Sequence, residues 1–261
     1  MRTPLLQRLY EEFDIDNLPL QQHGKTSDAL GKLYEKYIIE IFKDMDSIST
    51  FYSSIYLQEK EIIQKFLDIK NITFTDIFDI SSSDRDLGRT IAGGSPKTDV
   101  VITLTLHGQP PLCIPLNIKA SSKNKVSIAE YDAETICTSV GIPDGELKDL
   151  IFKHQNDQSA KNFTFLQKQR LTELLKPYRK EFIRWCITLN SQPSQENILY
   201  PDLLIRFKVI NREFVSVEMC DIETYIDTKI AAAEKRNSGF GTGLSWTYAS
   251  GSGSKKMQFK G

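Results

Sequence analysis

The chain of 261 residues contains 40% hydrophobic and 26% charged side chains, which excludes wholesale disorder and a fibrous or membrane-embedded chain. Its 33 Lys and Arg residues nearly balance its 34 Asp and Glu residues, and the net charge of −1 excludes a protein that holds nucleic acid by bulk positive charge. The length favours one large domain, residues 1–261, over two independent ones. We expect a soluble globular protein in which any site for a polyanion is local.

The sequence carries no signal for export, membrane insertion or zinc binding. Its N-terminus is acidic and lacks the apolar core of a signal peptide. The most apolar run, residues 100–106, is far shorter than the roughly 20 residues of a membrane helix. The four cysteines and three histidines are scattered and include no CxxC pair. We therefore expect a cytoplasmic protein with reduced thiols and no contact with a membrane.

An amphipathic helix is the first element that the pattern predicts. A Thr-Ser pair at residues 26–27 can cap it, and apolar side chains recur at spacings of three and four over residues 30–41. Glu35 lies beside this apolar stripe, where it can point into a cleft or into solvent. Further along, the polar residues 81–94 predict a loop that brings polar groups toward Asp99.

A β-hairpin and two helices are predicted next. Residues 99–106 and 112–119 are apolar runs on either side of a short turn that contains Gly and Pro, which is typical of a hairpin. The run Ser127-Ile128-Ala129-Glu130 fits the capping box that opens a helix. Asp144 can open another helix, which is predicted to end before a polar loop at residues 154–161.

The C-terminal half mixes helices and strands. A helix is predicted over residues 164–175 and must end near Pro177, because proline cannot continue a helix. Residues 182–189 predict a strand, and residues 204–210 and 213–219 predict a second hairpin. This interleaving indicates an α/β fold, with a mixed β-sheet flanked by helices on both faces.

Charge is distributed unevenly along the chain. Residues 1–50 carry six basic and nine acidic side chains, whereas residues 229–261 carry six basic side chains and one acidic side chain. The C-terminal segment, residues 237–261, also combines glycines with aromatic residues that a pure linker would lack. It offers side chains that can read base edges and phosphates, namely Thr247, Tyr248, Ser250, Lys255, Lys256, Gln258 and Lys260.

The predicted hairpin brings three polar side chains to one end of a sheet. Asp99 begins its first strand, and Asn117 and Lys119 end its second strand on a shared face, because side chains two apart point the same way. A carboxylate and an amide oxygen suit Mg²⁺, and Lys119 could orient an attacking water and offset negative charge. An Asp and a Lys at strand ends are also commonplace, so spacing alone leaves an ordinary polar strand end open.

A basic loop follows this strand. Lys123 and Lys125 precede the predicted helix start at Ser127, and a helix N-terminus behind lysines can cradle a phosphate. The alternative is a solvated basic loop. Asp84 and Asp86 could likewise reach a metal ion or simply belong to an Asp-rich turn.

Several long segments closely resemble the MspI-like type II restriction endonucleases, which cut DNA at CCGG. The resemblance spans essentially the whole chain and is carried by residues 86–99, 115–119, 125–131, 239–244, 246–252 and 255–261. The first segment ends in Ser95-Pro96-Lys97-Thr98-Asp99, and the second reads Pro115-Leu116-Asn117-Ile118-Lys119. Matches of this length are far more specific than the short Pro-Asp and (Asp/Glu)-x-Lys signature of nucleases in general.

The resemblance implies the PD-(D/E)xK nuclease fold, with Asp99, Asn117 and Lys119 as the catalytic set and Asp99 and Asn117 as ligands of Mg²⁺. Asn117 stands where most of that superfamily has an acid, so the metal site loses one negative charge. Glu35 is the residue that the resemblance offers to restore it. Tyr200 occupies a position where this family has a histidine, so no proton-handling role is carried over to it.

For recognition of double-stranded DNA, the resemblance points to Ser127 and to Thr247, Tyr248, Ser250, Gln258 and Lys260 of the C-terminal segment. Lys and Gln suit C·G pairs, because Lys donates to guanine and Gln can both donate and accept. Lys123 and Lys125 are further candidates for DNA contacts.

The sequence thus favours a Mg²⁺-dependent endonuclease that cuts double-stranded DNA at CCGG and leaves 5′-phosphate and 3′-hydroxyl ends. A catalytically inactive, sequence-specific DNA-binding protein is the first alternative, and the intact catalytic set argues against it. A protein-interaction domain with a basic tail fits the composition but leaves the resemblance unexplained. The favoured function implies a cytosine methyltransferase in the same host, as a protective activity rather than a binding partner.

Overall fold

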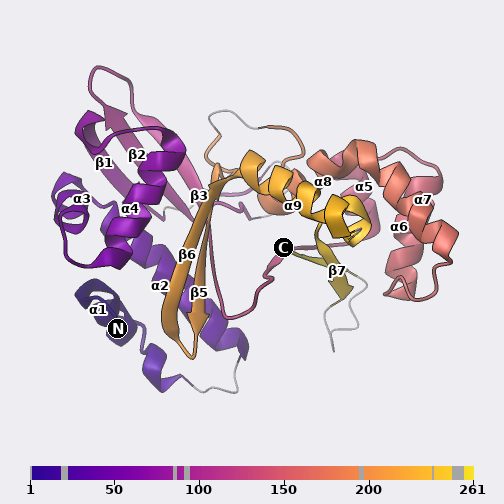
Figure 1. Cartoon of the computed structure of the whole chain (residues 1–261), viewed down its shortest axis with the longest axis horizontal. Coiled ribbons are helices and arrows are strands. Elements are labelled where there is room, and N and C mark those ends of the chain that lie inside the picture. Colours follow the sequence, from indigo (N-terminus) through magenta and orange to yellow (C-terminus); the bar gives the residue numbers. More distant parts are fainter. Residues whose placement is uncertain are drawn as a thin grey trace. The chain divides into compact units, whose positions relative to one another are not determined.

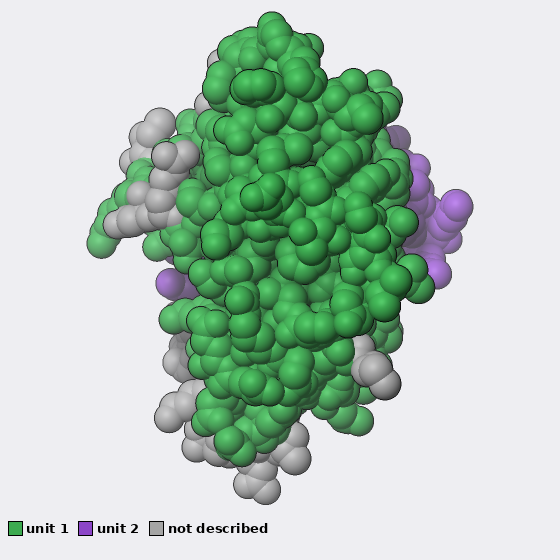
Figure 2. All heavy atoms as spheres, turned by 90° about the vertical axis from the view of Figure 1, so that its left-hand side faces the viewer, with its two compact units in different colours: residues 1–124, 196–221 green, residues 125–195, 222–261 purple. Residues whose placement is uncertain are grey.

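A computed structural model describes residues 2–18, 23–84, 87–90, 95–193, 197–236, 238–248 and 256–261, with side chains from residue 26 onward in the second range. The chain forms two compact units, drawn in different colours in Figure 2. Unit 1 comprises residues 1–124 and 196–221, and unit 2 comprises residues 125–195 and 222–261. Each unit is therefore assembled from segments that lie far apart in the sequence.

Unit 1 is built on a mixed five-stranded sheet in the order β1-β2-β3-β5-β6 (Figure 1). Its strands are β1 (Ile77–Ser83), β2 (Val100–Leu106), β3 (Leu112–Ser121), β5 (Leu203–Ile210) and β6 (Glu213–Asp221). Neighbouring strands are antiparallel except for β3 and β5, which are parallel. The parallel pair is formed by strands that lie far apart along the chain, and it joins the two predicted hairpins into one sheet.

Helices pack against this sheet. They are α1 (Pro4–Glu12), α2 (His23–Ile41), α3 (Met45–Tyr52) and α4 (Leu57–Lys70), with the 3-10 turns η1 (Ile15–Asn17) and η2 (Phe74–Asp76). The core consists of helix residues such as Leu33 together with the strand residues Ile102, Leu116 and Ile205, which share one face of the sheet. Helix α2 lies across the strands (Figure 1) and packs against β2 and β3, which places its side chains beside the ends of these strands.

Unit 2 contains a smaller antiparallel sheet in the order β4-β8-β7, formed by β4 (Ser127–Tyr131), β8 (Met257–Lys260) and β7 (Ser245–Tyr248). Its helical elements are α5 (Ala133–Val140), α6 (Glu146–Asp157), α7 (Phe165–Leu175), η3 (Lys176–Tyr178), α8 (Arg179–Thr188), α9 (Ile222–Arg236) and η4 (Gly239–Gly241). Aromatic packing supports the sheet, because Trp246 stacks on Phe182 at a ring-centroid distance of 5.3 Å and Phe259 packs edge-on against both rings.

The α/β prediction of a mixed sheet flanked by helices is confirmed, and so are several elements. The hairpin of β2 and β3 and that of β5 and β6 have the predicted strands. Asn211 and Arg212 join the latter pair with φ values of 50° and 66°, as a tight type I′ hairpin turn requires. Helix α7 begins after Thr164, which forms a capping box with Gln167.

The predicted helix start at Ser127 is wrong, because residues 127–131 form strand β4. The helix begins instead at Ala133, where the carboxylate of Asp132 accepts a hydrogen bond of 2.8 Å from the backbone nitrogen of Thr135. The partner of β4 is β8, at the far end of the chain, so no local pattern reveals it.

The predicted strand over residues 182–189 is also wrong, because this segment belongs to helix α8. All residues from Phe182 to Thr188 are buried, including the polar Arg184 and Thr188, so this part of the helix has no solvent-exposed side. Two boundaries also shift: Ser81–Ser83 lies in β1 rather than in a loop, and α6 continues past His154. Within the described ranges, no helix is both long and apolar enough to cross a membrane.

Candidate functional site

The hairpin of unit 1 holds Asp99 against the end of β3. Val100 is paired with Leu116, and the backbone nitrogen of Asp99 donates to the carbonyl of Leu116 at 2.8 Å. In return, the Asp99 carboxylate accepts a hydrogen bond of 2.7 Å from the backbone nitrogen of Ile118. The carboxylate is therefore fixed by the backbone of the strand that carries Asn117 and Lys119.

Lys119 and Asn117 complete this cluster, which we call the catalytic end and define as Asp99, Asn117 and Lys119. The Lys119 ammonium lies 3.6 Å from the Asp99 carboxylate. The Asn117 side chain is only 4% exposed, and its amide nitrogen donates to the carbonyl of Lys97. This bond orients the amide and leaves its oxygen as the group that a metal ion could bind. The structure thus brings together the three side chains that the hairpin register predicts.

Glu35 faces the same site from helix α2. Burial raises the pKa of its carboxyl, the negative charges of Asp99 and Asp84 raise it further, and the positive charge of Lys119 opposes them. Glu35 is half-buried rather than fully exposed to solvent, and of the two positions that the sequence leaves open the structure therefore favours the one toward the site. Two carboxylates that repel each other in a half-buried site are an arrangement that a divalent cation would stabilise.

The donor set suits Mg²⁺ better than a transition metal. In the described part of the chain, no three His, Cys, Asp or Glu side chains are grouped so as to hold a metal ion. The catalytic end instead offers one carboxylate and one amide oxygen, with Glu35 as a second carboxylate nearby. Mg²⁺ is commonly held by one or two carboxylates, keeps several water molecules and takes phosphate oxygens from the substrate. These residues therefore fit a magnesium site.

Arg206 is a residue beside the catalytic end that sequence reasoning missed. It is paired with Lys119 on the neighbouring strand β5, and its guanidinium donates to the carbonyl of Lys123. The backbone nitrogen of Lys123 also donates to the Ser121 hydroxyl at 3.0 Å. Arg206 therefore holds the basic loop after β3, and the loop does not lead into a helix N-terminus as predicted. A charged residue alternating with apolar ones in β5 was the only available signal.

In unit 2, the sheet presents a polar face made of Ser127, Glu130, Thr247, Gln258 and Lys260. On β8, Gln258 and Lys260 share this side, and Met257 and Phe259 are buried on the other. The strands align these residues in two rows. Ser127 lies opposite Lys260, and Glu130 and Thr247 flank Gln258.

A β-bulge in β4 places Ser127 and Glu130 on the same face of the sheet. The register of β4 shifts between Ser127 and Ala129, so that both Ser127 and Glu130 lie opposite polar-face residues of β8. In a regular strand, residues three apart would point to opposite faces. Beside the strands, the Lys125 ammonium donates to the Ser245 hydroxyl at 2.6 Å. The predicted DNA-contacting residues Ser127, Thr247, Gln258 and Lys260 thus occupy one surface, together with Glu130, which the sequence marked only as a helix cap.

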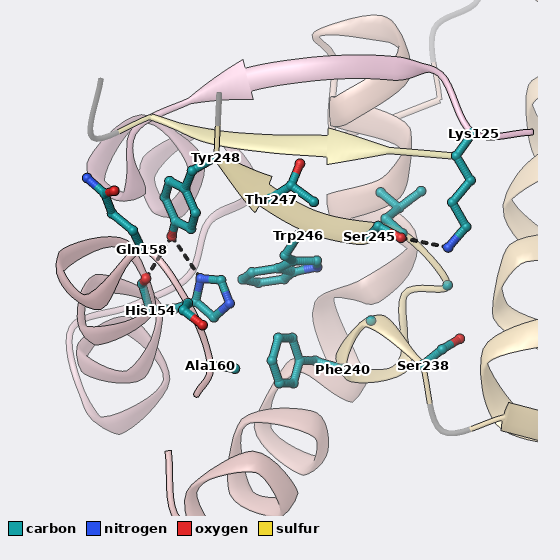
Figure 3. Close-up of a pocket in the computed structure, with 14 residues that line it drawn as sticks. Lys125, His154, Gln158, Ala160, Ser238, Phe240, Ser245, Trp246, Thr247 and Tyr248 are labelled. Atoms are coloured by element: carbon teal, nitrogen blue, oxygen red, sulfur yellow. Dashed lines mark hydrogen bonds between the residues drawn. The ribbon is translucent and has the colours of Figure 1, made fainter. Parts of the chain in front are cut away.

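Tyr248 lies on the other side of this sheet, as Figure 3 shows. Its hydroxyl donates to the carbonyl of His154 at 2.7 Å and lies 2.8 Å from Nδ1 of the same residue. Burial lowers the pKa of His154 to about 4, so the imidazole is neutral at physiological pH. His154, Phe240, Trp246 and Tyr248 line part of a pocket of about 450 Å³. The Tyr248 hydroxyl is therefore bound within the fold.

Three further residues were named in the sequence analysis. Ser250 and Lys255 lie outside the described residues. Tyr200 is half-buried in the turn before β5, where its backbone nitrogen donates to the carbonyl of Asn197.

The model of the family described as restriction endonuclease MspI matches residues 21–261. The chain belongs to the MspI restriction endonuclease family. It is 64% identical over 262 residues to the type II restriction enzyme MspI of Moraxella sp., with both chains covered completely. It is also 26% identical over 265 residues to the type II restriction enzyme BsuFI of Bacillus subtilis, covering 91% of this chain and 60% of that enzyme.

A solved structure agrees with this assignment. The crystal structure of restriction endonuclease MspI in complex with its cognate DNA matches the chain with a TM-score of 0.96 at 64% identity, and the match covers both chains fully. The resemblance, the restriction-endonuclease fold and the classification as a type II restriction enzyme are confirmed. Restriction endonucleases of this family generally depend on a metal ion.

Proposed function

We propose that this restriction endonuclease hydrolyses double-stranded DNA within CCGG, requires Mg²⁺, and leaves 5′-phosphate and 3′-hydroxyl ends. The observation that carries the proposal is the convergence of Asp99, Asn117 and Lys119 at one end of a hairpin, with Glu35 facing it. Full-length similarity to an enzyme whose crystal structure holds its cognate DNA supports DNA as the substrate.

Asp99 and the side-chain oxygen of Asn117 would hold Mg²⁺, and Glu35 would supply the second carboxylate that Asn117 does not provide. When bound, Mg²⁺ supplies Lewis-acid stabilisation of the negative charge that develops on the scissile phosphate. The backbone of Ile118 fixes the Asp99 carboxylate, and the carbonyl of Lys97 fixes the Asn117 amide. Both ligands are therefore oriented before any metal ion binds, which reduces the entropic cost of binding.

Lys119 has two roles in this proposal. Its ammonium would orient the attacking water and would donate to a phosphate oxygen as negative charge builds up in the transition state. The oxygen of water forms a bond to phosphorus in line with the leaving group, and that water gives up one proton to the solvent. The bond between phosphorus and the 3′-oxygen breaks, and the 3′-oxygen takes up a proton from a solvent water molecule. The contact with Asp99, at 3.6 Å, helps to hold the ammonium in place.

The polar face of unit 2 would read the bases. Lys260 can donate to O6 and N7 of guanine, and Gln258 can donate to guanine or accept from cytosine. Ser127 and Thr247 would add hydroxyl contacts, and Lys123 and Lys125 would contact phosphates. Tyr248 and Ser250 remain candidates from the resemblance alone. For Tyr248, the hydroxyl would have to exchange its bonds to His154 for a bond to DNA.

The proposed activity implies where in the cell the enzyme acts and how the host's own DNA is protected. DNA that enters a cell is cut where it arrives, so we place the enzyme in the cytoplasm. The same activity threatens the host's own CCGG sites, so we expect a cytosine methyltransferase that protects them without binding this chain.

The test is to incubate plasmid DNA with the protein, with and without Mg²⁺, and to sequence the cut ends. A plasmid from which every CCGG has been removed serves as the matched control. We expect cuts only within CCGG, only with the metal ion, and with 5′-phosphates at the new ends. Binding to CCGG without cleavage would support the inactive DNA-binding alternative, and cuts at another sequence would refute the proposed specificity.

A further inference from the structure

The side chain of Gln258 is held from both sides on the polar face. Thr247, on β7, donates from its hydroxyl to the backbone carbonyl of Gln258 at 3.1 Å and lies 3.5 Å from the amide oxygen. Glu130, on β4, accepts from the amide nitrogen at 3.3 Å. The three residues form one row across the sheet, with Gln258 in the middle.

This arrangement fixes which end of the amide faces which neighbour. A carboxylate only accepts hydrogen bonds, so the amide nitrogen must point toward Glu130. If the amide were turned around, its oxygen would face a negatively charged carboxylate and lose its favourable contact with Thr247. Glu130 therefore decides the direction in which Gln258 presents its remaining N–H donor and its oxygen.

The charge of Glu130 is unusual for a surface that meets DNA. In the part of the chain that the structure describes, the carboxylate is half-exposed and forms no ion pair, and its bond to Gln258 occupies only one of its oxygens. A carboxylate is repelled by phosphates and by the acceptor atoms of guanine and thymine. The amino groups of cytosine and adenine are the base-edge partners that it can accept from in the major groove.

We propose that Glu130 is a specificity-determining residue, which accepts a hydrogen bond from the N4 amino group of a cytosine and orients Gln258 toward the neighbouring guanine edge. The inference rests on the proposed function, since it assigns one contact within CCGG. Thymine in place of that cytosine presents O4, an acceptor, to the carboxylate, so Glu130 acts chiefly by rejecting thymine. Adenine presents an amino group there, so its rejection depends on other residues.

The experiment compares Glu130→Gln with the unmodified enzyme on a panel of short duplexes. The panel contains CCGG, versions with T·A or A·T in place of C·G at each cytosine, and a scrambled duplex. Affinity is measured in Ca²⁺, and single-turnover cleavage is measured in Mg²⁺. The substitution keeps the size of the side chain and gives it a donor that can meet thymine O4.

We expect Glu130→Gln to bind CCGG about 5- to 150-fold more weakly, the factor that corresponds to one good base contact. Preference for cytosine over thymine at one position should fall by a similar factor, while preference over adenine there changes less. Affinity for the scrambled duplex should stay the same or rise, because a negative charge has been removed.

Glu134→Gln is the matched control, because Glu134 is a carboxylate of the same unit that pairs with Lys148 on the helices. It should leave the whole panel unchanged. Equal loss on every duplex, or unchanged rejection of thymine, would overturn the inference. Failure of the unmodified enzyme to bind or cut CCGG would instead refute the proposed function, so the two failures are distinguishable. Melting temperatures of both variants check that they are folded.

Discussion

The catalytic end of unit 1 and the polar face of unit 2 are assembled in different ways. Asp99, Asn117 and Lys119 belong to one hairpin, and backbone hydrogen bonds between its two strands position them. The polar face takes its residues from three strands, and the bonded pair Glu130 and Gln258 is separated by 128 residues of chain. A local hairpin is well suited to fixing reactive groups, whereas a sheet of distant strands collects donors and acceptors over a wider surface.

The two regions also differ in the kind of group they hold. The catalytic end combines a carboxylate, an amide oxygen and an ammonium, with the Glu35 carboxylate nearby, and these groups suit a metal ion and a phosphate. The polar face combines hydroxyls, an amide, a carboxylate and an ammonium, as recognition of base edges requires. Substitutions at the catalytic end should therefore abolish cleavage and leave selective binding to CCGG intact. Substitutions at the polar face should weaken selective binding and leave the cleavage step intact.

The largest effect is expected from Asp99→Asn. The variant would leave two neutral amides at the proposed magnesium site with Glu35 as the remaining carboxylate, and Mg²⁺ gives up its water reluctantly when a carboxylate ligand is lost. Cleavage should become undetectable, a loss of several kcal/mol of transition-state stabilisation. Binding of CCGG in Ca²⁺ should remain selective, which a gel-shift titration with cognate and scrambled duplexes measures. Near-normal cleavage by this variant would remove Asp99 from the active site.

Asn117→Asp is the matched variant, because it changes the charge of the proposed metal site in the opposite direction to Asp99→Asn. It adds a negative charge where Asn117 now presents an amide, so the Mg²⁺ concentration that gives half the maximal rate should change. If both Asp99→Asn and Asn117→Asp kept the normal Mg²⁺ dependence, ligation by these residues would be contradicted.

Lys119→Ala should have the next largest effect. Removing one preorganised donor costs about two to three orders of magnitude in rate, or roughly 3–4 kcal/mol, because the donor acts mainly in the transition state. Single-turnover cleavage measures the loss, and DNA binding should persist. Lys65→Ala is a suitable control, since this lysine of unit 1 donates to the carbonyl of Val217 and pairs with Glu61. Cleavage by Lys119→Ala at nearly the normal rate would show that the catalytic end is wrongly assigned.

The same contrast explains how much could be predicted from the sequence. The strands that carry Asp99 and Lys119 are adjacent along the chain, and their apolar pattern and turn predict the hairpin correctly. The position of Glu35 could not be decided, because its helix fits a cleft or solvent equally well until α2 is packed on the sheet. Arg206 was missed because its neighbour β3 is a parallel strand from a distant part of the chain.

In unit 2 the sequence was a poorer guide. Ser127 and Glu130 have the spacing of a helix capping box, and only pairing with β8 shows that they belong to a bulged strand. The short run from Phe182 to Thr188 is rich in apolar residues that are all buried in the structure, and such runs are hard to assign to a helix or a strand from sequence. The residues Gln258 and Lys260 were found through the resemblance rather than through local pattern, because the contacts that define the polar face are long-range.

The sheet that carries the polar face is packed on its other side against His154, a neutral imidazole that is hydrogen-bonded to Tyr248 of β7. Burial lowers the pKa of His154 from about 6.5 in an unfolded chain to about 4 in the folded protein, despite the opposing charge of Asp157. The unfolded chain therefore binds this proton more readily, and the stability that the neutral imidazole provides is complete above about pH 6.5 and is lost as the pH falls toward 4.

We expect this group to contribute about 2 kcal/mol of pH-dependent stability between pH 7.5 and pH 5. Urea unfolding of the unmodified enzyme and of His154→Gln at both pH values measures it. The variant should be less stable at pH 7.5 but lose less stability on acidification. A pH dependence as steep as that of the unmodified enzyme would show that His154 is not the responsible group.

Gln258→Ala and Lys260→Ala should each weaken binding to CCGG by roughly 1–3 kcal/mol, the range for one base contact, while affecting scrambled DNA less. Cleavage of saturated CCGG should change little, because the catalytic end is intact. The measurement is a titration in Ca²⁺ with both duplexes. Equal losses on the two duplexes would reduce the polar face to an electrostatic anchor and would point to recognition by the loop at residues 121–127.

The smallest effect is expected from Lys125→Met, which removes one positive charge beside the polar face. If Lys125 contacts only phosphate, cognate and scrambled duplexes should be bound more weakly by the same factor, and the slope of log K against log salt should fall by about one. Its hydrogen-bond partner, the Ser245 hydroxyl, is uncharged and does not offset the lysine, so the variant would release one counterion less from the DNA.

Lys148→Met is the control for this measurement, because that lysine pairs with Glu134 and Asp144. It should leave the slope unchanged. A loss confined to CCGG would instead assign Lys125 to base recognition and extend the polar face beyond its five residues. A loss on both duplexes with an unchanged slope would indicate that Lys125 acts by holding Ser245, and therefore strand β7, in position.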